Sequence, residues 1–140
     1  MTAILDGLYL GNIDDAFSSK LTMHPTAVIN CAKELPMSPY AVAYMKLDLA
    51  DSTRERILPH FADTNDFIDA QLKMGRRVLV HCAAGISRSA TIVIGYIMYR
   101  HKMPFKDAYA YVKEKRNVIN PNFGFTCQLY TYSEHLGLSV

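Results

Sequence analysis

The stretch from Val78 to Arg100 constrains the fold more than any other part of the sequence. It begins with Val-Leu-Val-His, a short apolar run typical of a buried strand, and it ends in ATIVIGYIMYR, which is typical of a central buried helix. Between them lies a tight turn of seven residues, Cys82 to Arg88. Such a turn directs its backbone N–H groups, and the positive end of the helix, toward one point. Gly85 supplies the backbone freedom that the turn requires. The segment therefore predicts an anion-binding site between a strand and a helix.

Two residues of this turn give the predicted site its chemistry. A phosphate dianion is the natural occupant, and Arg88 would add a bidentate pair of hydrogen bonds to it. The same site would stabilise the thiolate of Cys82, so we expect this cysteine to be deprotonated near neutral pH and to attack phosphorus. Ser89 is expected to hydrogen bond to the sulfur, and His81 to orient the turn. The other residues expected to bind phosphate are Ala83, Ala84, Gly85, Ile86 and Ser87.

Each of these residues also has an ordinary structural explanation when it is taken alone. A single buried cysteine is usually a small apolar side chain, and a single arginine at the start of a helix is usually solvated. A chance His-Cys-x-x-Gly-x-x-Arg in a chain of 140 residues is, however, an event on the order of one in ten thousand. The complete pattern therefore favours a phosphate-binding site over a purely structural role.

The rest of the chain alternates strand and helix patterns and then becomes helical. Short apolar runs predict strands at residues 26–31, 43–48 and 78–81, and a short edge strand at Leu8–Leu10. Helical periodicity predicts helices over residues 58–74 and 88–102, one that starts with Pro104 as its first residue, and one after Pro121. This order indicates an α/β sheet flanked by helices. Because repeats and low-complexity linkers are absent, we expect a single domain over residues 1–140.

Composition limits the cellular compartments and the classes of partner that we expect for this protein. The formal net charge is +2 and no apolar run reaches membrane-spanning length, so neither a nucleic acid nor a membrane is expected as a partner. Residues 1–70 hold 5 Lys+Arg and 10 Asp+Glu, whereas residues 71–140 hold 10 and 3, so the second half can form an anion-binding surface unless folding interleaves the halves. Three cysteines and an N-terminus without signal-peptide features favour a reducing compartment. We expect a cytoplasmic protein, with the nucleus as an open alternative.

The sequence HCAAGISRS resembles the active-site signature of the dual-specificity protein phosphatases, a branch of the cysteine-dependent phosphatases. The similarity also includes LYLGN near the start, the spacing from Asp51 to Phe61, and NPNFGFTCQL at residues 120–129. It implies a central, mostly parallel twisted sheet with helices on both faces. It further implies hydrolysis of phosphotyrosine and phosphoserine or phosphothreonine in proteins through a cysteinyl-phosphate, without metal or cofactor. We expect no kinase-docking domain before this region, so the resemblance is to the atypical, catalytic-domain-only members of the family.

Release of a tyrosine or threonine oxygen from phosphorus needs a proton donor. The segment LDLADSTRER supplies two candidates, Asp48 and Asp51. Asp48 ends an apolar run, which is typical of a structural residue at the end of a strand. Asp51 begins a polar loop, and it matches the family's acid by its distance from the following helix. We therefore favour Asp51.

Further expectations concern residues outside the turn. Asn120 matches a family position close to the active-site loop, which implies a supporting role. Cys31 closes the strand AVINC, and in a parallel sheet beside residues 78–81 it would emerge at the same edge as Cys82. It also resembles the second cysteine with which some phosphatases of this superfamily protect the nucleophile; the alternative is a buried, inert thiol. Cys127 and the charged run Lys113–Arg116, expected as an exposed helix end, are given no role. The five histidines lack metal-ligand spacing, so no metal site is expected.

Two other functions are compatible with the sequence. One is a phosphoinositide or RNA 5′-phosphatase that uses the same loop. Such relatives tend to place basic residues inside the loop, whereas Ala83, Ala84, Ile86 and Ser87 are uncharged, which weakens that hypothesis. The other is a phospho-binding module without activity. It would be expected to lack the nucleophile, the arginine or the acid, and this sequence has candidates for all three.

Overall fold

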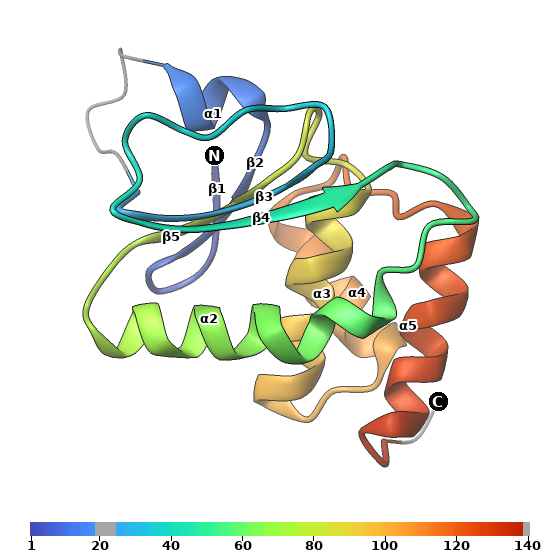
Figure 1. Ribbon diagram of the computed structural model, residues 1–140. Coiled ribbons are helices and arrows are strands. Elements are labelled where there is room, and N and C mark those ends of the chain that lie inside the picture. The colour runs from blue at the N-terminus through green and yellow to red at the C-terminus, as the bar shows by residue number, and fades with distance from the viewer. Residues whose placement is uncertain (19–24, 139–140) are drawn as a thin grey trace.

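The computed structural model of the protein describes residues 1–18 and 25–138 (Figure 1). Its strands are β1 (Thr2–Leu5), β2 (Leu8–Gly11), β3 (Ala27–Ala32), β4 (Ala43–Leu49) and β5 (Val78–His81). Its helices are α1 (Ile13–Phe17), α2 (Phe61–Lys73), α3 (Arg88–His101), α4 (Phe105–Lys115) and α5 (Phe123–His135), with a short 3₁₀ helix η1 (Leu58–His60) before α2. The predicted α/β class is confirmed. Within the described ranges, no helix is both long and apolar enough to cross a membrane.

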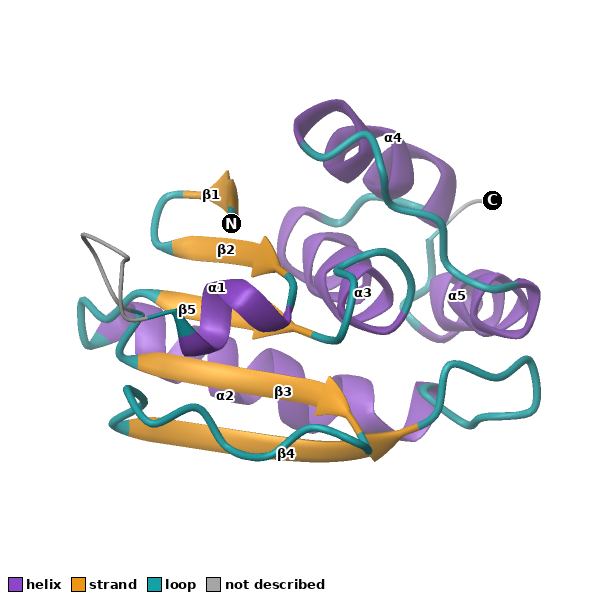
Figure 2. Ribbon diagram, turned by 90° about the horizontal axis from the view of Figure 1, so that it is seen from above, coloured by secondary structure: helices purple, strands orange, loops and turns teal. Residues whose placement is uncertain are grey.

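The strands form one sheet in the order β1-β2-β5-β3-β4. β5 pairs in parallel with β2 on one side and with β3 on the other, and β3 pairs in parallel with β4. β1 runs antiparallel to β2 and forms the edge. The sheet is thus mostly parallel, as the resemblance implied. Because the parallel strands end at the same side of the sheet, the loops that follow them gather around the loop after β5 (Figure 2).

Helices cover both faces of the sheet, but unequally (Figure 2). α1 lies on one face, where Ala16 packs with Val28 and Leu79. α2 and α3 lie on the other face, and α4 and α5 pack around α3 (Figure 1). The division follows from the alternation of side chains along a strand, because Ile29 and Val80, next to Val28 and Leu79, belong to the larger core.

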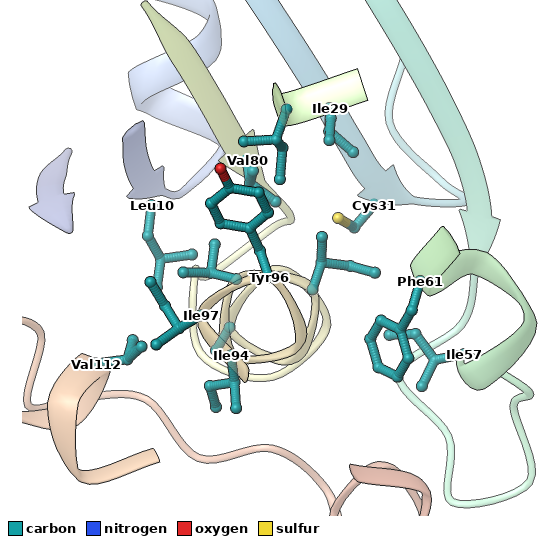
Figure 3. Packing of buried hydrophobic residues seen from close by; sticks show 14 of the residues in the cluster. Leu10, Ile29, Cys31, Ile57, Phe61, Val80, Ile94, Tyr96, Ile97 and Val112 are labelled. Atoms are coloured by element: carbon teal, nitrogen blue, oxygen red, sulfur yellow. The ribbon is translucent and has the colours of Figure 1, made fainter. Parts of the chain in front are cut away.

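α3 is the centre of the larger core because nearly its whole surface is apolar. Every residue from Arg88 to Met98 is buried. Figure 3 shows the buried side chains of the sheet and of the neighbouring elements around this helix. A Cβ atom at Gly95 would come within 2.7 Å of the Phe61 ring, so glycine lets α2 approach α3 closely. Each large aliphatic side chain buried here contributes about 1.5–3 kcal/mol to folding. This packing fixes the first residue of α3, Arg88, near the carboxyl ends of the parallel strands.

The prediction of an edge strand at Leu8–Leu10 is wrong, because β2 lies between β1 and β5. The chain before it forms a further strand, β1, and the turn Asp6–Gly7 joins the two in a hairpin. Gly7 has a φ of 84°, and Asp-Gly is a favoured hairpin turn for that reason. β1 was not predicted, and neither was α1, a helix of five residues. Asn12 caps α1 by accepting a hydrogen bond from the Asp15 backbone.

Two predicted helix starts also need correction. The predicted helix over residues 58–74 begins as the 3₁₀ turn Leu58–His60, and the α-helix itself starts at Phe61. Pro104 is the N-cap of α4 rather than its first helical residue. Its backbone is extended, with φ −61° and ψ 162°, while its carbonyl accepts a hydrogen bond from Ala108 N. Proline suits this position because it has no N–H to leave without a partner.

Candidate active site

The turn that carries Cys82 follows β5 in the middle of the sheet and leads directly into α3. Cys82 is 3% exposed, and Arg88 is 6% exposed. Gly85 has a φ of 69°, and a Cβ atom there would come within 2.6 Å of the Gly11 carbonyl oxygen. The turn therefore needs glycine both for its backbone conformation and for its approach to the end of β2. The predicted arrangement of strand, tight turn and helix is present.

Ser89 and His81 both contact Cys82, one through its sulfur and the other through its backbone. The Ser89 hydroxyl oxygen is 3.1 Å from the Cys82 sulfur, and Ser89 is fully buried. A hydroxyl in that place can donate to a thiolate. The Nδ1 of His81 is 3.4 Å from the Cys82 carbonyl oxygen. Burial lowers the pKa of His81, which favours a neutral ring that holds the backbone over one that transfers protons at neutral pH.

The guanidinium of Arg88 is held by a carboxylate that the sequence analysis did not identify. Glu34, just after β3, accepts hydrogen bonds from Nη1 at 2.6 Å and from Nη2 at 2.8 Å. The Leu49 carbonyl, at the end of β4, accepts a second bond from Nη1 at 3.0 Å. An arginine has five N–H donors, and these bonds use three of them. The donors that remain, Nε–H and one on Nη2, form a single edge of the guanidinium, which suits a bidentate contact with phosphate.

The ion pair keeps both partners charged. Hydrogen bonding from Arg88 lowers the pKa of the Glu34 carboxyl from 4.5 to about 2. Hydrogen bonding to Glu34 likewise raises the pKa of Arg88, and the nearby Cys82 and Asp51 add to that effect. A lowered carboxyl pKa means that the pair stabilises the fold fully above pH 4.5 and is lost as the pH falls through about 2.

Asp51 lies on the loop after β4, and the start of α5 holds this loop in place. The Asn122 side-chain amide donates a hydrogen bond of 2.9 Å to Asp51 Oδ1. Gly124 allows close contact, because a Cβ atom there would come within 2.1 Å of the Thr53 carbonyl oxygen. Further along α5, the Gln128 side chain accepts from the backbone N–H groups of Ile57 and Leu58. The motif NPNFGFTCQL thus holds the loop that carries Asp51.

The other acidic candidate, Asp48, lies elsewhere. It is within β4, its side chain is 73% exposed, and its carboxylate is 3.3 Å from the Lys46 ammonium. Asn120 does lie against the turn, but through its backbone, whose N–H donates to the Ile86 carbonyl at 2.7 Å. In the described part of the chain, no group of three or more His, Cys, Asp and Glu side chains is arranged to bind a metal ion.

Cys31 lies beside Cys82, at the carboxyl end of β3. Asn30 and His81, the residues just before the two cysteines, are partners in the parallel register of β3 and β5. Figure 3 shows the Cys31 sulfur on the core side of the sheet. Cys31 is fully buried, and burial together with the neighbouring Cys82 raises the pKa of its thiol well above the usual value. Cys127 is exposed on α5.

The charged run at residues 113–116 needs a further correction. Its last residue, Arg116, is half-buried rather than exposed, and its Nε donates to the Gly85 carbonyl oxygen at 3.0 Å. Lys113 also has a partner, the Ile119 carbonyl. Sequence reasoning missed Glu34, Asn122 and Arg116 as parts of the site. A signal for Asn122 was the motif NPNFGFTCQL, whereas Arg116 stands in a run that is typical of a solvated helix end.

Known proteins resemble this chain in sequence over nearly its whole length. The family model described as the dual specificity phosphatase catalytic domain matches residues 8–135. Human serine/threonine/tyrosine-interacting protein is 44% identical over 142 residues, which cover 94% of this chain and 64% of that protein. Human dual specificity protein phosphatase 16 is 40% identical over 139 residues, or 96% of this chain and 21% of that protein. The chain thus spans less than two thirds of the length of these curated relatives.

A solved structure extends the likeness to three dimensions. The crystal structure of the human tyrosine phosphatase-like serine/threonine/tyrosine-interacting protein superimposes with a TM-score of 0.88 at 43% identity, covering 96% of each chain. The strands, the turn after β5 and the helices around α3 therefore form a fold already known in a relative of high identity. Because the family model covers most of the sequence and the fold agrees, the chain belongs to the dual specificity phosphatase family.

Proposed function

We propose that this chain hydrolyses phosphotyrosine and phosphoserine or phosphothreonine in proteins through a cysteinyl-phosphate. The observation that carries the proposal is the construction of a single turn: the buried Cys82 sulfur lies 3.1 Å from a hydroxyl, and Arg88 at the end of the turn keeps one edge of its guanidinium for phosphate. Asp51, on the loop held by α5, is the proposed proton donor. The similarity to human dual specificity protein phosphatase 16 supports proteins as the substrate class.

The proposed reaction has two steps. The Cys82 thiolate attacks phosphorus, the bond from phosphorus to the side-chain oxygen breaks, and Asp51 gives its proton to that oxygen. Water then attacks the cysteinyl-phosphate, Asp51 takes a proton from the water, and the sulfur leaves as a thiolate. Ser89 donates to that thiolate and makes it a better leaving group. Arg88 and the backbone N–H groups of the turn bind the phosphoryl oxygens throughout.

The substrate class is tested by a comparison of rates. The protein is given phosphotyrosine peptides, phosphothreonine peptides and soluble phosphoinositides, each with and without a metal chelator. The proposal expects hydrolysis of the peptides, at rates that the chelator does not change. A clear preference for phosphoinositides would instead favour the lipid phosphatase alternative, which the uncharged side chains of Ala83, Ala84, Ile86 and Ser87 disfavour.

Asp51→Asn is expected to slow hydrolysis of phosphotyrosine peptides by about 10²- to 10⁴-fold, the usual contribution of a general acid. Aryl phosphates with very acidic leaving groups should lose much less, because their oxygen leaves without a proton. The alkaline limb of the pH–rate profile should also flatten. Steady-state rates on both substrates over a range of pH measure these effects.

Asp48→Asn is the matched control, since Asp48 lies on β4 beside Lys46. It should leave both rates and the pH profile close to those of the wild type. If Asp48→Asn shows the dependence on the leaving group and Asp51→Asn does not, the assignment of Asp51 is wrong.

Cys31 is proposed to protect the nucleophile from oxidation. Hydrogen peroxide would convert the Cys82 thiolate to a sulfenic acid, and the Cys31 thiol would then displace water to form a disulfide. After mild peroxide treatment, non-reducing peptide mapping should show a Cys31–Cys82 link, and a dithiol should restore activity. Cys31→Ser should be inactivated irreversibly at lower peroxide doses. Equal sensitivity of Cys31→Ser and the wild type would leave Cys31 as a core residue only.

A further inference from the structure

The backbone of the phosphate-binding turn has an orientation that something must maintain. If the N–H groups of residues 83–88 are to point at a bound phosphate, the carbonyl groups of the turn must point outward. Where such a carbonyl is shielded from water, as at the buried Gly85, it needs a donor of its own, because buried peptide oxygens without partners destabilise a structure. The donors on the outside of the turn therefore help to set the geometry inside it.

Backbone N–H groups supply these donors at both ends of the turn. The Ala83 carbonyl accepts from Ile13 N at 3.1 Å, at the start of α1. The Ile86 carbonyl accepts from Asn120 N at 2.7 Å, and the Ser87 carbonyl from Thr91 N at 2.9 Å. The Thr91 hydroxyl also donates to the Ser87 carbonyl, at 2.8 Å. Three different segments thus hold the ends of the turn, and no side-chain substitution removes their backbone bonds directly.

The two central carbonyls are held by a side chain. Arg116 Nε donates to the Gly85 carbonyl oxygen at 3.0 Å, and Nη2 lies 3.5 Å from the Ala84 carbonyl oxygen. The third nitrogen, Nη1, donates to the Thr2 hydroxyl on β1 at 2.9 Å. The guanidinium also contacts the turn closely, because a Cβ atom at Gly85 would lie 2.6 Å from Nη2. Arg116 therefore spans the outside of the turn and is itself attached to the edge of the sheet.

We propose that Arg116 is a positioning residue for phosphate binding. This role rests on the proposed function. Arg116 holds the carbonyls of Ala84 and Gly85 outward, so that the N–H groups that follow them point at the phosphate. Arginine suits the task because its planar fork reaches successive carbonyls and a hydroxyl at once, whereas a lysine ammonium is a single point of contact. Arg116 acts on the outer side of the turn, and Arg88 on the phosphate itself.

The test is Arg116→Met, which keeps much of the length and apolar character of the side chain and removes the donors. Binding of inorganic phosphate, measured by calorimetry, should weaken about tenfold, the scale of a hydrogen bond to a charged group. The loss in kcat/KM should be the same for phosphotyrosine peptides and for aryl phosphates with acidic leaving groups, because proton donation is untouched. Lys115→Met is the matched control. Its ammonium lies over the Tyr111 ring, 5.1 Å from the centroid, and phosphate binding should not change.

Two variants that perturb the fold less test the role of Arg116 if Arg116→Met does not fold. Arg116→Lys should bind phosphate with an affinity between those of Arg116→Met and the wild type, and Thr2→Val, which frees Nη1, should also weaken binding. Wild-type affinity for phosphate in folded Arg116→Met or Arg116→Lys overturns the inference. So does a loss confined to peptides, which would make Arg116 a substrate contact. Calorimetry measures phosphate binding without turnover. If the wild type binds phosphate but does not hydrolyse phosphopeptides, the proposed function fails, and the role of Arg116 is still tested by the binding data.

Discussion

Cys82→Ser is expected to lower the turnover of phosphotyrosine peptides by roughly four orders of magnitude or more, the scale on which loss of a covalent nucleophile acts. The serine hydroxyl stays protonated in a site that stabilises a thiolate, so the attack on phosphorus does not occur. Binding should survive, because Arg88 and the backbone of the turn are unchanged. The measurement is steady-state hydrolysis together with calorimetric titration of a phosphopeptide.

The matched control is Cys127→Ser, which changes an exposed cysteine on α5 and should retain the wild-type rate. Substantial hydrolysis by a Cys82→Ser sample shown by mass spectrometry to be free of wild type would contradict the mechanism. Loss of binding as well as turnover, with the fold intact, would show that the sulfur is needed for the shape of the turn.

Arg88→Lys is expected to lower kcat/KM by roughly three orders of magnitude, as when preorganised donors are removed from a site of developing charge. The positive charge is kept, but the planar fork is lost. A lysine ammonium cannot bind the Glu34 carboxylate at two points and present a second edge to phosphate at the same time. KM should rise and kcat should fall, because Arg88 binds the phosphate in the ground state and in the transition state.

Arg100→Lys provides the comparison for this variant, since Arg100 is an exposed arginine near the other end of α3. It should behave as the wild type, whereas near-wild-type activity of Arg88→Lys would count against the phosphate-binding role of Arg88. A thermal unfolding curve of each variant separates a lost contact with phosphate from a lost contact with Glu34.

The turn after β5 could be predicted from the sequence because the signals that indicate it are local. A buried strand, a glycine, an arginine and an apolar helix follow one another without interruption, so the pattern predicts the order of strand, turn and helix before any tertiary contact is known. The α/β class followed from the alternation of strands and helices, and the mostly parallel sheet from the family resemblance. The core position of α3 followed from its apolar surface on all sides.

The partners of the turn could not be predicted because each of them is distant in the sequence. Glu34 is 54 residues from Arg88, Asn122 is 71 residues from Asp51, and Arg116 is 31 residues from Gly85. The local sequence around a charged residue is the same whether its side chain has a distant partner or is solvated. Only the tertiary fold distinguishes the two cases.

The hairpin formed by β1 and β2 was not predicted, although its signal in the sequence is local. The sequence ILDGLYL contains an Asp-Gly pair between two apolar runs, which is a local signal of a tight hairpin. The runs are short, with four residues in each strand, and period-2 alternation is hard to recognise over that length. The hairpin matters for the site, because Thr2 on β1 holds the guanidinium of Arg116.

Trapping the covalent intermediate shows whether Cys82 carries the phosphoryl group during hydrolysis. A phosphotyrosine peptide is mixed with the protein, the reaction is quenched in acid within the first turnover, and the peptides are mapped by mass spectrometry. We expect one phosphoryl group on Cys82, together with release of the dephosphorylated peptide. In Asp51→Asn the phosphorylated protein should accumulate further, when the substrate's leaving group is acidic enough to depart without a proton. Release of product without any phosphoryl group on Cys82 would contradict the mechanism. Tight binding of the phosphopeptide without release of product would contradict the proposed activity and leave a phospho-binding module.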